Sequence, residues 1–184
     1  MLFEIIKTEL RMKMKIAYLA VAFSFIMNVL PVVAQTNVGK KVEQVSVRDS
    51  RNNPIPLPHF GEKHLLIFYV DPDARNQNAE FIEYLEENKI KSDKIFSFGV
   101  ANLADTFLPN SLVRTFIRLK EKKVNEAIYT DPEHLLRDAW NIGDVNGKLT
   151  VIFITKDKKI AYYGSGELSK AQIDEFFKTI DKYK

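Results

Sequence analysis

The run Leu65-Leu66-Ile67-Phe68-Tyr69-Val70 decides the fold class of this chain. Six consecutive apolar residues, some of them β-branched or aromatic, predict a strand that is buried on both faces of a sheet. The polar segment Asp71–Asn76 ends this strand, and the apolar spacing beyond it predicts a helix over residues 76–88. A buried strand that leads directly into a helix is typical of a parallel β–α–β crossover.

The same alternation of strands and helices continues to the end of the chain. Further strands are expected over residues 95–101, 127–129, 150–154 and 160–163, and further helices over residues 111 to about 120, after Asp131-Pro132, and after a capping box formed by Ser169 and Gln172. Upstream, Val47 and the extended segment 55–58 predict a hairpin at a sheet edge, because proline blocks ladder donation. The order predicts an α/β fold, a three-layer α/β/α sandwich with a mixed central sheet and an N-terminal β-hairpin.

Residues 1–34 are expected to lie outside this fold. A basic stretch that ends at Lys15 precedes an apolar run, Ile16 to Val33, and Ala34 follows. This pattern predicts a signal peptide that is cleaved after Ala34. An uncleaved anchor is the alternative, because the apolar run is near the spanning length. Both interpretations predict an exported protein with one domain over residues 35–184, either periplasmic or held on the outer face of the inner membrane.

Composition excludes several classes of function. The sequence contains no cysteine, which rules out disulfides, thiolate metal sites and thiol nucleophiles. Two of the three net positive charges belong to residues 1–34, so the domain itself is nearly neutral. A nearly neutral exported domain argues against a nucleic-acid partner.

The order of elements resembles the thioredoxin-like superfamily in its exported, peroxiredoxin-like and TlpA-like form. The resemblance rests on Val47-Arg48-Asp49, Pro56-Leu57 and Leu65–Phe68 for the opening hairpin and first central strand, and on Asp131-Pro132, Ala139-Trp140 and Leu149–Ile154 for the third helix and closing hairpin. Within the superfamily the chain is most similar to the YtfJ-type periplasmic proteins, through Leu112-Val113-Arg114-Thr115 and Ile128–Asp131. The YtfJ-type resemblance implies no established activity.

The redox pattern of the superfamily is missing at both of its halves. The resemblance places the redox thiols in the turn that Asp71–Asn76 occupies here, where no residue carries sulfur. It places a cis-proline at the position of Leu149, before Thr150. A cis bond there would cost about 3 kcal/mol without proline, so we expect a trans bond. No thiol-dependent activity is therefore expected.

The loop at the redox-motif position is the first candidate ligand site. It contains Asp71, Asp73, Arg75 and Asn76, and it lies where open α/β folds place their ligands, ahead of a helix N-terminus. In the alternative interpretation, Asp73 or Asn76 only caps that helix. Arg114 is the secondary candidate because a guanidinium can clamp an anion with two hydrogen bonds. A surface ion pair is the alternative for Arg114.

Other patterns predict no site. His59, His64 and His134 are not expected to converge, and Asp71-x-Asp73 lacks the rest of a calcium loop. The triplet Gly164-Ser165-Gly166 is interpreted as a turn. We therefore predict no catalytic residue, no metal and no cofactor from these patterns.

The leading hypothesis is a non-redox binding or interaction module of the bacterial envelope. Its partner would be an envelope protein or a small ligand, with membrane contact only through an uncleaved N-terminal segment. The alternative is an enzyme that uses Asp71, Asp73 or Arg75 for non-thiol chemistry. A third hypothesis is a structural protein that completes an oligomer through an exposed apolar patch.

Overall fold

The computed structural model describes residues 37–90, 92–124 and 126–184. The expected signal peptide lies outside the described residues. Within them, no helix has both the length and the apolar character that a membrane crossing requires.

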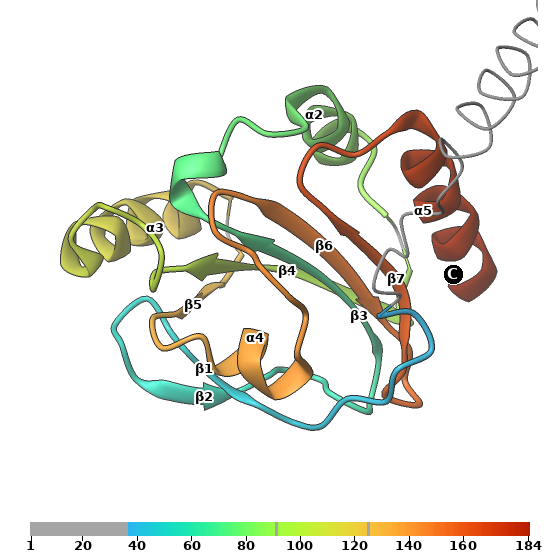
Figure 1. Ribbon diagram of the computed structural model, residues 1–184, viewed down its shortest axis with the longest axis horizontal. Helices are drawn as coiled ribbons and strands as arrows, with labels where there is room; N and C mark the ends of the chain where they lie inside the picture. Colours follow the sequence, from blue (N-terminus) through green and yellow to red (C-terminus); the bar gives the residue numbers. More distant parts are fainter. Residues whose placement is uncertain (1–36, 91, 125) are drawn as a thin grey trace, which may run out of the picture. The chain divides into compact units, whose positions relative to one another are not determined.

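The domain is built on one seven-stranded mixed sheet (Figure 1). The strands are β1 (Ser46–Arg48), β2 (Pro54–Pro56), β3 (His64–Val70), β4 (Ile95–Asn102), β5 (Ile128–Asp131), β6 (Leu149–Ile154) and β7 (Ile160–Ser165). Their order across the sheet is β2-β1-β5-β4-β3-β6-β7. The ladders between β3, β4 and β5 are parallel, and the others are antiparallel. The predicted edge hairpin is formed by β1 and β2.

Helices cover both faces of this sheet. They are the 3-10 turn η1 (Pro72–Ala74) and the helices α2 (Ala79–Glu87), α3 (Asn110–Val124), α4 (Leu135–Trp140) and α5 (Lys170–Tyr183). Alternate residues of β3 point to opposite faces, so Leu65 and Ile67 pack with α4, whereas Leu66 packs with α2 and α5. Helix α3 covers Ala101 and Ile128 on the α2 side. The structure confirms the predicted three-layer α/β/α sandwich.

Two helices begin later than the sequence predicts. Residues Pro72–Ala74 form a separate 3-10 turn, so α2 begins at Ala79 instead of residue 76. The helix expected directly after Asp131 begins at Leu135. In both cases the N-cap residue has left-handed backbone, with φ of 56° at Asn78 and 58° at His134. A left-handed residue cannot continue a right-handed helix, and it turns the chain into the first helical turn instead.

Two smaller predictions also need correction. Gly164 and Ser165 belong to β7 and only Gly166 lies in the turn, with φ of 79°. The apolar spacing of residues 112, 113, 116 and 117 predicts one buried face for α3, but the structure leaves the side chains of Leu112 and Phe116 exposed. Among the described side chains of α3, the buried ones are Val113 and Ile117.

Candidate functional site

Asp71 stands at the carboxyl end of β3, where the superfamily resemblance places redox thiols. Its side chain is 1% exposed. One carboxylate oxygen accepts a hydrogen bond from the amide of Asp73 at 2.9 Å, and the other accepts one from the amide of Gly147 at 2.8 Å. The amide of Asp71 donates to the carbonyl of Lys148 at 3.1 Å. The chain's own backbone donors thus hold this carboxylate and join the end of β3 to the approach of β6.

Leu149, at the position equivalent to the cis-proline, belongs to the same junction. It faces Val70 in the β3–β6 ladder, and its amide donates to Oε1 of Gln77 at 2.7 Å. The peptide bonds of the described residues are all trans, which confirms the trans bond expected at this position. Asp71 and Gln77 therefore accept hydrogen bonds from Gly147 and Leu149, the residues on either side of Lys148 where the chain enters β6.

The other residues of the predicted ligand loop point away from this junction. Asp73 is exposed, and its carboxylate accepts a hydrogen bond from the amide of Phe107 at 3.3 Å. Arg75 and Asn76 are exposed. Neither Asp73 nor Asn76 caps α2, because the N-cap residue is Asn78, whose side chain instead binds Gly166 and Leu168 at 2.8 Å each. The four predicted residues share one loop, but the structure brings only Asp71 into a buried network.

A histidine–carboxylate pair lies at the carboxyl ends of β4 and β5, and the sequence analysis missed it. Nε2 of His134 lies 2.7 Å from Oδ2 of Asp105, and Nδ2 of Asn102 donates to the same oxygen at 2.6 Å. The side chains of His134 and Asp105 are each 15% exposed. A histidine fixed by a carboxylate can hold or transfer a proton. The sequence signal that could have predicted this pair is the position of Asp105 and His134 shortly after two predicted strands, because parallel strands bring their carboxyl ends to one edge of the sheet.

A second buried contact at this edge joins the phenol of Tyr69 to Asp131. The hydroxyl donates to Oδ2 of Asp131 at 3.1 Å, and burial together with this carboxylate raises the pKa of Tyr69. Asp131 also accepts hydrogen bonds from the amides of Leu135 and Leu136 at 2.8 and 3.0 Å. Asp131 is therefore not the N-cap residue of α4, which is His134, but its side chain accepts the first two amides of the helix from the end of β5.

The three histidines lie at separate places, as the sequence predicted. His59 pairs with Glu62, whereas His64 accepts a hydrogen bond from the amide of Lys156 at 3.0 Å. His134 is 2.7 Å from Asp105. Among the residues that the structure describes, no three histidine or acidic side chains gather in a way that could hold a metal ion.

Arg114 differs from the surface ion pair that was considered for it. Its Nε is buried and has no hydrogen-bond partner. Burial and the neighbouring guanidinium of Arg48 lower the pKa of Arg114, against a smaller opposite effect of Glu133. An unpaired donor of this kind is unusual in a folded protein.

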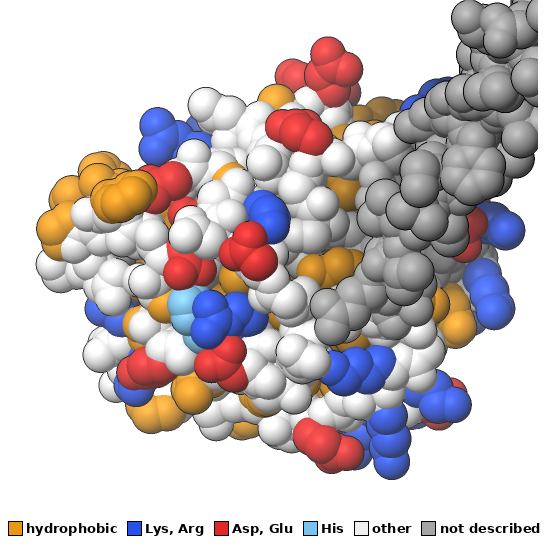
Figure 2. Space-filling model, viewed as in Figure 1, with side chains coloured by type: hydrophobic (Ala, Val, Ile, Leu, Met, Phe, Trp, Pro, Cys, Tyr) orange, Lys and Arg blue, Asp and Glu red, His pale blue; other side chains and the backbone are white. Residues whose placement is uncertain are grey.

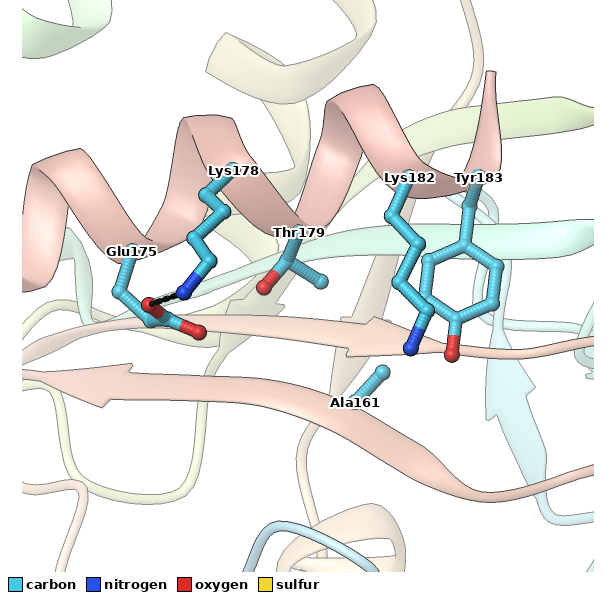
Figure 3. Close-up of a pocket in the computed structure, with 6 residues that line it drawn as sticks. All are labelled: Ala161, Glu175, Lys178, Thr179, Lys182 and Tyr183. Atoms are coloured by element: carbon cyan, nitrogen blue, oxygen red, sulfur yellow. Dashed lines mark ion pairs between the residues drawn. The ribbon is translucent and has the colours of Figure 1, made fainter.

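A hollow of about 250 Å³ lies between α5 and β7 (Figure 3). Its lining comes from Ala161, Glu175, Lys178, Thr179, Lys182 and Tyr183. Glu175 and Lys178 form an ion pair at 3.6 Å across one end, and Lys182 lies over the ring of Tyr183. These polar groups already have partners within α5, so the hollow has the character of a solvated helix surface.

The fold and the junction at Asp71 define the chain as a protein of thioredoxin-like fold without its sulfur chemistry. Comparisons with solved structures agree on the fold. The exposed lipoprotein thioredoxin of Streptococcus pneumoniae superposes with a TM-score of 0.57 at 14% identity, over 76% of this chain and 99% of the other. A putative thioredoxin of Neisseria meningitidis gives 0.56 at 18% identity, over 78% and 91%. The peroxidoxin BcpB of Mycobacterium tuberculosis gives 0.54 at 16% identity, over 80% and 97%.

Comparisons of the sequence identify no family for the chain. No family model matches the chain, and no curated protein matches it. Identities below 20% between these structures establish a shared fold alone, so the function has to be argued from the residues.

Proposed function

We propose that this chain is an exported thioredoxin-fold protein that binds a partner in the bacterial envelope and has no thiol redox activity. One observation carries the proposal: at the position of the redox thiols stands Asp71, buried and held by backbone donors, in a chain without cysteine. Thiol–disulfide exchange and peroxide reduction both need a thiolate that attacks sulfur or oxygen. A carboxylate cannot replace it in either reaction.

Export is supported by the pattern of residues 1–34 and by the character of one structural neighbour. A basic segment, an apolar run and Ala34 fit a signal peptide. The pneumococcal neighbour is itself an exposed lipoprotein. The similarity to YtfJ-type periplasmic proteins, through Leu112–Thr115, agrees with the same location.

A binding role is supported by an apolar stripe on α3, which we define as Leu112, Phe116 and Leu119. These side chains are 42%, 56% and 59% exposed, and Phe107 just before the helix is 96% exposed. Figure 2 shows hydrophobic side chains gathered over the beginning of α3. Neighbouring large apolar side chains on a surface are typical of a protein–protein contact.

The redox part of the proposal is tested with the purified chain. Insulin-disulfide reduction and peroxide turnover should both stay at the level of the blank, whereas a cysteine-containing thioredoxin measured in parallel should be active. Turnover above the blank would refute the proposal.

The binding part is tested by photo-crosslinking in the cell envelope. A photoreactive residue at Phe116 should give a defined adduct with another protein, whereas the same residue at the exposed Lys178 of α5 should give none. Equal adducts from both positions, or no adduct from Phe116, would contradict a partner at α3. An adduct with a second copy of the chain would favour self-association instead.

An enzyme with non-thiol chemistry is the second candidate function, and we propose a different centre for it from the loop at Asp71. The observation that favours it is the Asp105–His134 pair, whereas Asp71 is occupied by its own backbone. Substitution His134→Gln should then abolish complementation of a deletion strain, whereas His59→Gln should not. Complementation by both variants would remove the enzymatic alternative.

A further inference from the structure

Three arginines lie between α3 and strand β1, and we call them the arginine cluster: Arg48, Arg114 and Arg118. Arg114 and Arg118 lie four residues apart on one side of α3, next to the buried residues Val113 and Ile117, and both side chains are half-buried. Arg48 ends β1, whose preceding residue Val47 packs on the opposite, α4, face. Because side chains alternate along a strand, Arg48 points to the face that α3 covers.

Two of these guanidinium groups have partners within the protein. Arg48 binds both carboxylate oxygens of Glu133, at 3.0 and 2.6 Å. Arg118 donates to the carbonyl of Ser50 and to the hydroxyl of Thr115, both at 2.9 Å. These contacts fix the orientation of the two side chains that flank Arg114.

Arg114 is the exception in the cluster. Its Nε is buried without a hydrogen-bond partner, and no carboxylate among the described residues lies within ion-pair distance of its guanidinium. Burial, and after it the positive charges of Arg48 and Arg118, lower the pKa of Arg114. A guanidinium keeps its proton even so, because its pKa starts far above neutrality.

The cluster therefore combines an excess of positive charge with an unused donor. Of the three guanidinium groups, only that of Arg48 forms an ion pair with a carboxylate among the described residues, namely with Glu133. A buried donor without a hydrogen-bond partner destabilises a fold unless another group supplies an acceptor. A ligand with several acceptor oxygens would supply that interaction.

We infer that the arginine cluster is a binding site for an oxyanion group, with Arg114 as its principal ligand contact and Arg48 and Arg118 as its flanks. The planar fork of a guanidinium matches two oxygens of a phosphate or a carboxylate, which an ammonium group does not. The inference rests on the proposed binding function and gives it a ligand chemistry. It can fail by itself, because the arginine cluster and the apolar stripe lie on different sides of α3.

Thermal unfolding of the full chain in different sodium salts tests the site. At equal ionic strength, phosphate should raise Tm relative to chloride by about 5 °C once its concentration is well above Kd. Sulfate and acetate identify the source of the oxygens: a rise with phosphate and sulfate alone indicates a tetrahedral anion, and a rise with acetate as well indicates that carboxylates are accepted. Equal Tm values in all four salts would overturn the inference.

Variants separate binding at Arg114 from a general effect of charge. Arg114→Met should lose the phosphate-dependent rise, and Lys120→Met, which removes the same charge from an exposed position of α3, should keep it. In chloride, Arg114→Met should be at least as stable as the wild type, because a buried nitrogen without a hydrogen-bond partner is gone. Arg114→Lys keeps the charge but not the fork, so its rise should fall to less than half. A full rise in either Arg114 variant would refute the site.

Discussion

At the scale of single residues, Asp71 occupies the position of the expected redox thiols and there stabilises the fold by accepting backbone hydrogen bonds. Substitution Asp71→Ala removes a buried acceptor, 1% exposed, from the amides of Asp73 and Gly147. The expected loss in the free energy of unfolding is about 2–4 kcal/mol. Urea unfolding should show a lower midpoint with an unchanged m-value. The matched control is Asp73→Ala at an exposed position, and equal midpoints for the two variants would contradict the role of Asp71.

The buried hydroxyl of Tyr162 lowers the stability of the fold, because it has no hydrogen-bond partner. The side chain is buried in the core, and burial raises the pKa of Tyr162 to about 12. In the unfolded chain the phenol of Tyr162 has an ordinary pKa of about 10, so it loses its proton at a lower pH than it does in the folded chain. Stability should therefore fall as pH rises from 10 to about 12, with no contribution of this group below that window.

The variant Tyr162→Phe tests this directly. It should be as stable as the wild type or more stable at pH 7, because an unpaired hydroxyl is removed from the core. Urea midpoints measured between pH 8 and about pH 11 should fall less steeply for the variant than for the wild type. Parallel curves for the two proteins would show that Tyr162 does not ionise on unfolding.

At the scale of elements, periodicity predicted correctly that α3 is a helix but did not identify which of its apolar residues are buried. Apolar residues occupy both the sheet side and the outer side of this helix, so the spacing alone selected Leu112 and Phe116 together with Val113 and Ile117. Only the packed structure shows which pair faces Ala101 and Ile128. The starts of α2 and α4 were missed for a related reason, since left-handed N-cap residues such as His134 leave no clear sequence signal.

Truncation of side chains on the two sides of α3 should change the free energy of unfolding by very different amounts. Ile117→Ala removes a buried side chain and should cost about 2–4 kcal/mol of unfolding free energy. Leu119→Ala, on the outer side of the same helix, should change it by less than about 0.5 kcal/mol. Chemical denaturation of both variants makes the comparison. A large loss for Leu119→Ala would mean that the apolar stripe is covered in the isolated protein.

At the scale of the whole molecule, the sequence was sufficient for the fold and insufficient for the sites. The buried run Leu65–Val70 and the alternation of strands and helices are local patterns, and they led to the correct three-layer sandwich. The Asp105–His134 pair and the arginine cluster join residues far apart in the chain. Such groups become visible only when register and helix orientation are fixed, and Arg114 was found early only because it could be considered alone.

The strand order also predicts how stability is distributed over the domain. Strand β3 lies between β4 and β6, with helices over both faces, whereas β2 at the edge pairs with β1 alone. Amides of buried central strands exchange only on global unfolding, and edge elements open locally. In native-state hydrogen exchange of the full chain, Ile67 and Ile152 should therefore be the slowest class, and Ile55 should exchange at least a hundredfold faster. Comparable protection at Ile55 and Ile67 would mean that the edge hairpin unfolds only with the core, and that the sheet has no weak edge.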